Sequence, residues 1–225
     1  MAMVALTRMS TDTPEVMLTL TQWFSPAFPI GAFSFSHGLE SLVESGEIRS
    51  AEDVEDWLNS VLNYGAGRND VILMGASFRA SSTEEIKEVD ALARALSPSK
   101  ERLLETEVQG EAFIRTINEV WGSDLPPLCY PVAIGASART CGMPLHETAC
   151  MYLHALTSSL VSAAIRIVPL GQTEGQSIVR TLAPLCDQLG STYIDESLEA
   201  IGSSSFIGDI ASMTHEDQYS RMFRS

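Results

Sequence analysis

The uncharged stretch TACMYLHALTSSLVSAAI, residues 148–165, decides the fold class of this chain. Its leucines recur at helical spacing, and a second face carries only small side chains: Ala155, Ser159, Ser162 and Ala163. Small side chains let helix axes approach closely, so we expect this segment to be the central helix of an all-α bundle. At 18 residues it only reaches the lower limit for a membrane span. A buried core helix is favoured over the alternative, a membrane-associated protein built around this segment.

The rest of the chain is also helical in pattern, and no segment has the alternating pattern of a strand. Proline, glycine and capping residues divide it, with Ser50 and Thr83 as expected helix caps. The expected helices span 14–24, 33–46, 50–64, 70–80, 84–96, 97–121, 131–140, 144–168, 172–189 and 195–200. The sequence therefore predicts a single-domain, all-α bundle of about ten helices over residues 13–202. A disordered N-terminus (1–12) precedes it, and a flexible, partner-docking C-terminal tail (203–225) follows it.

The composition is that of an acidic globular protein. The net charge is −15, 45% of residues are hydrophobic, and only two of the fourteen basic residues are lysines. A field of this sign repels phosphate backbones, so nucleic-acid binding is disfavoured and basic protein partners or cations are favoured. The four cysteines are too few for a disulfide framework, and residues 1–10 lack the apolar core of a signal peptide. We expect a cytoplasmic protein with reduced thiols.

The sequence lacks the common catalytic motifs. There is no phosphate-binding G-x-x-x-x-G-K-[ST] loop, no G-x-S-x-G elbow and no paired CxxC motif. His146, Cys150 and His154 lie four residues apart, so all three are candidate metal ligands on one helix face. A metal-dependent hydrolase using His146, Glu147 and His154 is therefore the alternative function. His37, near Glu40, is a further candidate ligand, and a plain surface histidine is the simpler interpretation.

Two segments are rich in aromatic residues that cannot all be core. Residues 24–35 contain four of the eight phenylalanines, including Phe33, within twelve positions, so an exposed aromatic patch is predicted there. The tail contains a short apolar stripe made of Phe206, Ile207, Ile210 and Met213. Its last residues combine aromatic and arginine side chains, a composition that is enriched in interface hot spots. The tail is therefore predicted to order on binding a partner.

Three of these segments resemble the urease accessory protein F (UreF) family. They are SPAFPIGAFSFSHGLE at 25–40, YLHALTSSLVSAAIRIVPLGQTEGQ at 152–176 and MTHEDQYSRMFRS at 213–225. The segments are long, and their order and spacing fit the family from about Leu18 onward. His146 and Cys150 fall outside the family pattern, so the resemblance does not support them as ligands.

The resemblance implies an all-α, usually dimeric protein without catalytic activity or a stably bound cofactor. Family members join UreD (called UreH in some systems) and the GTPase UreG, and nickel passes through this assembly to apo-urease. The tail is implied to order when UreD binds. The implied partner-binding residues are Phe28, Pro29, Gly31, Phe33, Phe35, Glu40, Arg166, Gly171, Gln172, Met213, His215, Glu216, Tyr219, Arg221 and Phe223.

The chain has no phosphate-binding loop of its own, so it can only position or regulate a GTPase. Arg166 and Arg68 are candidates for an arginine finger. Arg166 ends an apolar helix, and the simpler expectation is that it bonds the last carbonyls or a buried acid.

Overall fold

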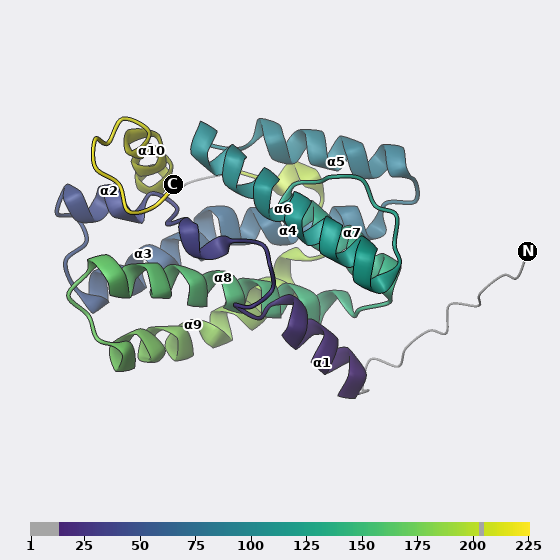
Figure 1. Ribbon diagram of the computed structural model, residues 1–225, viewed down its shortest axis with the longest axis horizontal. Helices are drawn as coiled ribbons and strands as arrows, with labels where there is room; N and C mark the ends of the chain where they lie inside the picture. Colours follow the sequence, from purple (N-terminus) through teal and green to yellow (C-terminus); the bar gives the residue numbers. More distant parts are fainter. Residues whose placement is uncertain (1–13, 203–204) are drawn as a thin grey trace, which may run out of the picture.

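The computed structural model describes residues 14–202 and 205–225, and across these ranges it contains helices and no strand (Figure 1). The all-α prediction is confirmed. The predicted disordered segment 1–12 and the first two tail residues, 203–204, lie outside the described part. The elements are α1 (Pro14–Trp23), η1 (Ala32–Ser34), α2 (Leu39–Glu44), α3 (Ala51–Tyr64), α4 (Ala66–Arg79), α5 (Thr83–Ala95), α6 (Lys100–Trp121), α7 (Tyr130–Cys141), α8 (Leu145–Ile167), α9 (Gln172–Tyr193), η2 (Leu198–Ala200) and α10 (Phe206–His215).

Helix boundaries follow local chemistry. Ser50 and Asp53 form a reciprocal capping box at the start of α3, as the sequence indicates. At α5 the expected cap is displaced by one residue, because Ser82 rather than Thr83 accepts the Glu85 backbone N–H. At α6 the cap is Ser99, so this helix begins later than expected.

The core is built around α4, α7, α8 and α9, and α8 contacts helices on several sides, which confirms its central position. Glycines allow backbone segments to approach α4 and α6 closely. A Cβ at Gly135 of α7 would lie 2.2 Å from the Met74 carbonyl oxygen of α4, and one at Gly110 of α6 would lie 2.0 Å from the Leu128 oxygen. Any side chain at these positions would force the backbones apart.

Within the described ranges, one helix, α8, is long and apolar enough to cross a membrane by length and composition alone. Half of its most apolar window is buried inside the structure. Its small residues do not all serve close packing as expected: Ala155, Ser159 and Ser162 line a groove, and Ala163 is buried.

The predicted helix 33–46 is wrong in its first half. Within it only the short η1 and α2 are helical, and the intervening residues Phe35–Gly38 form a buried, non-helical connection. Phe35 is extended, and His37 and Gly38 are left-handed, with φ of 57° and 78°. This backbone leaves Ser34 and Ser36 free to bond the end of the tail, which a continuous helix would prevent.

The tail lies on the body in this structure. Its helix α10 packs against α2 and α6, and residues 216–225 then pass back beside α2 (Figure 1). Phe223 is 4% exposed. From residue 205 onward, the tail is therefore a folded part of the domain.

Candidate docking site

The segment between α1 and α2 divides its phenylalanines between core and surface. Phe28 packs against Phe113 with ring centroids 5.2 Å apart, and Phe35 is buried. Phe33 is 73% exposed. Gly31, with φ of 74°, makes the left-handed turn that precedes it. The prediction of an exposed aromatic patch therefore holds for Phe33 but not for its two neighbours.

Glu40 is the centre of the contacts that hold the tail. Its carboxylate accepts the Met222 and Phe223 backbone N–H groups at 2.7 and 2.9 Å. The ring of His215 lies between Glu40, 3.3 Å from Nε2, and Glu101, 2.6 Å from Nδ1. The two carboxylates therefore bind α10 and the residues after it through one shared, fully buried histidine.

The end of the tail pairs with the backbone after η1. Arg224 N–H donates to the Ser34 carbonyl, and Ser36 N–H donates to the Ser225 carbonyl, both at 2.8 Å. The Ser36 hydroxyl also donates to the Ser225 carbonyl, and the Ser225 hydroxyl donates to Glu105 at 3.0 Å. These contacts join the tail to the aromatic segment, so the two segments predicted to bind partners form one surface.

Helix α10 has its small face inward and its large apolar face outward. Ala211 and Ser212 are buried, and a Cβ at Gly38 would lie only 2.7 Å from the Ser212 backbone nitrogen. The outer face is between 49% and 67% exposed at Phe206, Ile207, Ile210 and Met213. We call these four side chains the α10 apolar face. Tyr219 and Met222 extend it beyond the helix, and both are exposed.

A groove of about 800 Å³ runs between the aromatic segment and α8. Phe33 lies at its edge, and Arg166 fixes that edge by donating to the Phe33 carbonyl at 2.7 Å. The Arg166 guanidinium also lies 4.2 Å from the centre of the Phe223 ring. The sequence suggested that Arg166 bonds the carbonyls at the end of its helix or a buried acid. Instead, its contacts with Phe33 and Phe223 join the groove to the tail.

The floor of the groove is a buried polar cluster. Glu105 accepts a hydrogen bond from His37 at 2.9 Å and forms an ion pair with Arg102. Burial opposes the charge on Glu105, but Arg102 and His37 outweigh it and lower its pKa to about 2. Burial and Arg102 lower the pKa of His37, while Glu105 opposes this shift. The interpretation of His37 as a surface histidine is wrong, because it is 8% exposed and bonded.

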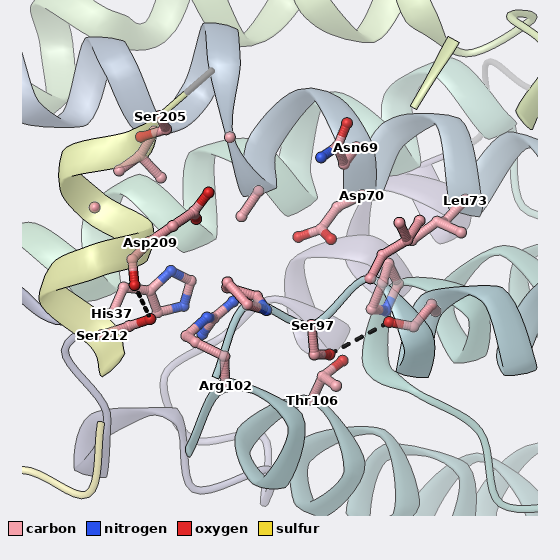
Figure 2. Close-up of a pocket in the computed structure, with 18 residues that line it drawn as sticks. His37, Asn69, Asp70, Leu73, Ser97, Arg102, Thr106, Ser205, Asp209 and Ser212 are labelled. Atoms are coloured by element: carbon pink, nitrogen blue, oxygen red, sulfur yellow. Dashed lines mark hydrogen bonds between the residues drawn. The ribbon is translucent and has the colours of Figure 1, made fainter. Parts of the chain in front are cut away.

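The same cluster reaches a second, smaller pocket of about 120 Å³ beneath α10. Figure 2 shows His37, Asp70 and Arg102 around this pocket, with Ser212 of α10 on its wall. Burial raises the pKa of Asp70 to about 6, although the Tyr152 hydroxyl donates to it at 2.6 Å. Asp70 is therefore a half-buried acid on the wall of the pocket, with a pKa close to the lower end of the physiological pH range.

The predicted metal ligands do not form the predicted set. His146 and Cys150 lie together, with Sγ and Nε2 3.4 Å apart, but the third group beside them is Asp187 of α9. His154 lines the groove instead. Eight residues rotate an α-helix by two full turns plus about 80°. His154 therefore points in a different direction from His146. Within the described ranges, His37 belongs to no such ligand cluster either.

The UreF family model matches residues 48–183. Over 217 residues the chain is 50% identical to the urease accessory protein UreF of Ruegeria pomeroyi, which covers 96% of this chain and all of the relative. The UreF protein of Roseobacter denitrificans is 46% identical over 96% of both chains. That of Cereibacter sphaeroides strain KD131 is 47% identical over 93% of this chain and 98% of its own length.

The chain belongs to the UreF family. The resemblance read from the sequence is thereby confirmed, and so is the prediction that this chain is no enzyme, because the family consists of non-catalytic accessory proteins of urease. It takes part in urease maturation.

In this UreF-family chain, the residues expected to bind partners fall into three groups, apart from Gly171. Some hold the tail: Glu40, Arg166, His215, Glu216, Arg221 and Phe223. Others fill the core or line the groove: Phe28, Phe35, Pro29, Gly31 and Gln172. Gly171 precedes α9, where its N–H donates to Glu174. Those with large exposed apolar side chains are Phe33, Met213 and Tyr219.

Sequence reasoning missed part of this UreF-family surface. Phe206, Ile207 and Ile210 form a stripe that the sequence shows, but they are not among the expected partner-binding residues, because a stripe alone does not say whether it faces the core or the solvent. Arg68, the other candidate finger, donates to the Ala200 carbonyl at 2.7 Å and lies over the Tyr193 ring. Both candidate arginines are therefore engaged within the chain.

Proposed function

We propose that this chain is the scaffold of a UreD/UreF/UreG assembly that inserts nickel into apo-urease in a GTP-dependent manner. In this proposal it acts in the cytoplasm as a homodimer and needs no bound cofactor for its role as scaffold. Nickel is cargo that passes through the complex. UreD (UreH) binds at the tail, and UreG binds the surface that the two proteins form together.

The observation that carries the proposal is the α10 apolar face. Four large apolar side chains stand exposed on one short helix that hydrogen bonds hold firmly to the body. A solvent-exposed face of this kind is unfavourable in an isolated protein and typical of a protein interface. Because the tail is already ordered by Glu40 and Glu101, binding would cost less conformational entropy than folding a free segment.

The chemistry of the chain suits an adaptor. It has no phosphate-binding loop, so GTP hydrolysis must belong to a partner. The net charge of −15 favours attraction of a basic partner surface or a cation. The hydrolase alternative loses its geometric basis, because His154 does not join His146.

Co-purification tests the proposal. The full-length chain, UreD and UreG are co-expressed with a tag on UreD only, and the eluate is analysed by size and mass. We expect all three proteins to elute together, and we expect reconstituted apo-urease to gain activity with nickel and GTP only when this chain is present. Elution of UreD with UreG but without this chain, or activation independent of it, would contradict the proposal.

A further inference from the structure

A separate cluster lies where the start of α8 faces the end of α9. His146 and Cys150 are one turn apart on α8, and Asp187 is on α9. Nε2 of His146 lies 3.4 Å from Sγ of Cys150 and 3.5 Å from Oδ1 of Asp187, and Sγ lies 3.7 Å from the same Oδ1. None of these residues lines the groove or the smaller pocket.

These separations match the edges of a tetrahedral metal site. Zinc binds histidine nitrogen at about 2.0–2.1 Å, thiolate sulfur at about 2.3 Å and carboxylate oxygen at about 2.0–2.2 Å. Tetrahedral angles then place nitrogen and sulfur about 3.6 Å apart, nitrogen and oxygen about 3.4 Å apart, and sulfur and oxygen about 3.6 Å apart. The three side chains therefore already hold one face of a coordination tetrahedron.

We propose that His146, Cys150 and Asp187 bind a borderline-soft divalent cation, with Zn²⁺ as the best fit. Nitrogen and sulfur ligands select such cations over Mg²⁺ and Ca²⁺, which prefer oxygen. The fourth position is open to solvent, since the His146 and Asp187 side chains are 43% and 72% exposed. Water or a group from another molecule completes the coordination. This site is independent of the proposed docking at α10.

Two residues of α9, Gly190 and Ser191, shape the surroundings of this cluster. A Cβ at Gly190 would lie 2.8 Å from the Cys150 sulfur, so glycine there provides the space for the thiol. The Ser191 hydroxyl donates to the Asp187 carbonyl at 2.9 Å, and its oxygen lies 2.9 Å from Nε2 of His146. A cation at Nε2 requires the neutral tautomer with its proton on Nδ1, and it replaces the Ser191 contact. Burial and Asp187 raise the pKa of the Cys150 thiol to about 12, so the metal-free thiol carries a proton. A bound cation replaces that proton, which passes to the solvent.

Titration of the full chain with Zn²⁺ by calorimetry tests the site. The variants are His146→Ala, Cys150→Ser and Asp187→Asn, and Cys141→Ser is the matched control, because Cys141 is a half-buried thiol at the end of α7. Titration with Co²⁺ gives a second readout, since a thiolate ligand produces a charge-transfer band. Circular dichroism checks that each variant keeps its helices, and His146→Ala changes only a partly exposed side chain.

We expect one Zn²⁺ per chain for the wild type and for Cys141→Ser. Affinity should fall about tenfold or more in each of the three ligand variants. Even mutation of a residue that only hydrogen-bonds to a ligand typically lowers metal affinity by about 10–100-fold. The cobalt–thiolate band should vanish in Cys150→Ser. Wild-type affinity in folded His146→Ala and Cys150→Ser, or a wild-type cobalt complex without a thiolate band, would overturn the proposal.

Discussion

Replacing Glu40 with alanine should release the end of the tail while leaving the bundle folded. Glu40 accepts the Met222 and Phe223 N–H groups at 2.7 and 2.9 Å, and its side chain is only 12% exposed. A hydrogen bond to a charged group contributes about 1.5–3 kcal/mol, so losing two costs about 3–6 kcal/mol locally. At about 1.4 kcal/mol for each factor of ten, the opening equilibrium should rise by about 100-fold or more.

Native-state hydrogen exchange measures this opening directly. In Glu40→Ala, the Met222 and Phe223 amides should lose about 100-fold or more in protection, because local opening governs their exchange. Amides in the centre of α8 should keep theirs. Glu44→Ala is the matched control, since Glu44 lies exposed on the same helix. Wild-type protection of both tail amides in Glu40→Ala would refute the role assigned to this carboxylate.

Three further changes test the surroundings of the tail. Gly38→Ala should displace α10 and increase the hydrogen exchange of its amides, because the added Cβ meets the backbone of Ser212. Gly31→Ala should add only the strain of a positive φ, about 1–2 kcal/mol, because nothing lies within 4 Å of its added Cβ. Phe28→Ala should lower the free energy of unfolding by about 3–5 kcal/mol, and Phe33→Ala by no more than about 0.5 kcal/mol, in denaturant titrations. Asp70 has a folded pKa of about 6 against an unfolded value of 3.8, so the native state binds more protons between those values. Its contribution should make stability fall as pH rises through that window, by on the order of 3 kcal/mol, and Asp70→Asn should remove this slope. Equal effects of the two glycine changes, equal losses for the two phenylalanines, or an unchanged slope would each contradict the corresponding contact.

The fold was largely predictable because its signals are local. The capping box at Ser50 and the periodicity of residues 148–165 both act within a few turns of one helix. The helix expected from residue 33 failed for a non-local reason. Ser34 and Ser36 bond the end of the tail, nearly the whole chain length away, and no local pattern reveals that pairing.

The site was less predictable, because a sequence pattern does not say which surface an apolar face meets. On α10 the sequence shows a stripe of large apolar side chains, but only the structure shows that Ala211 and Ser212 fit against Gly38 and leave this stripe exposed. Likewise, His37 looked exposed because its partner Glu105 lies on a distant helix. Contacts between elements that are distant in the sequence determine both the orientation of α10 and the burial of His37. Local sequence patterns do not reveal such contacts.

The central claim is that the α10 apolar face binds UreD. The most direct test is the dissociation constant for UreD of the double variant Ile207→Asp/Ile210→Asp, measured beside the wild type. Both side chains are more than 60% exposed, so the thermal unfolding temperature should stay the same. We predict that the affinity falls by at least about 100-fold, because two charges would be buried against an apolar partner. A stable double variant that binds UreD with wild-type affinity would contradict the account.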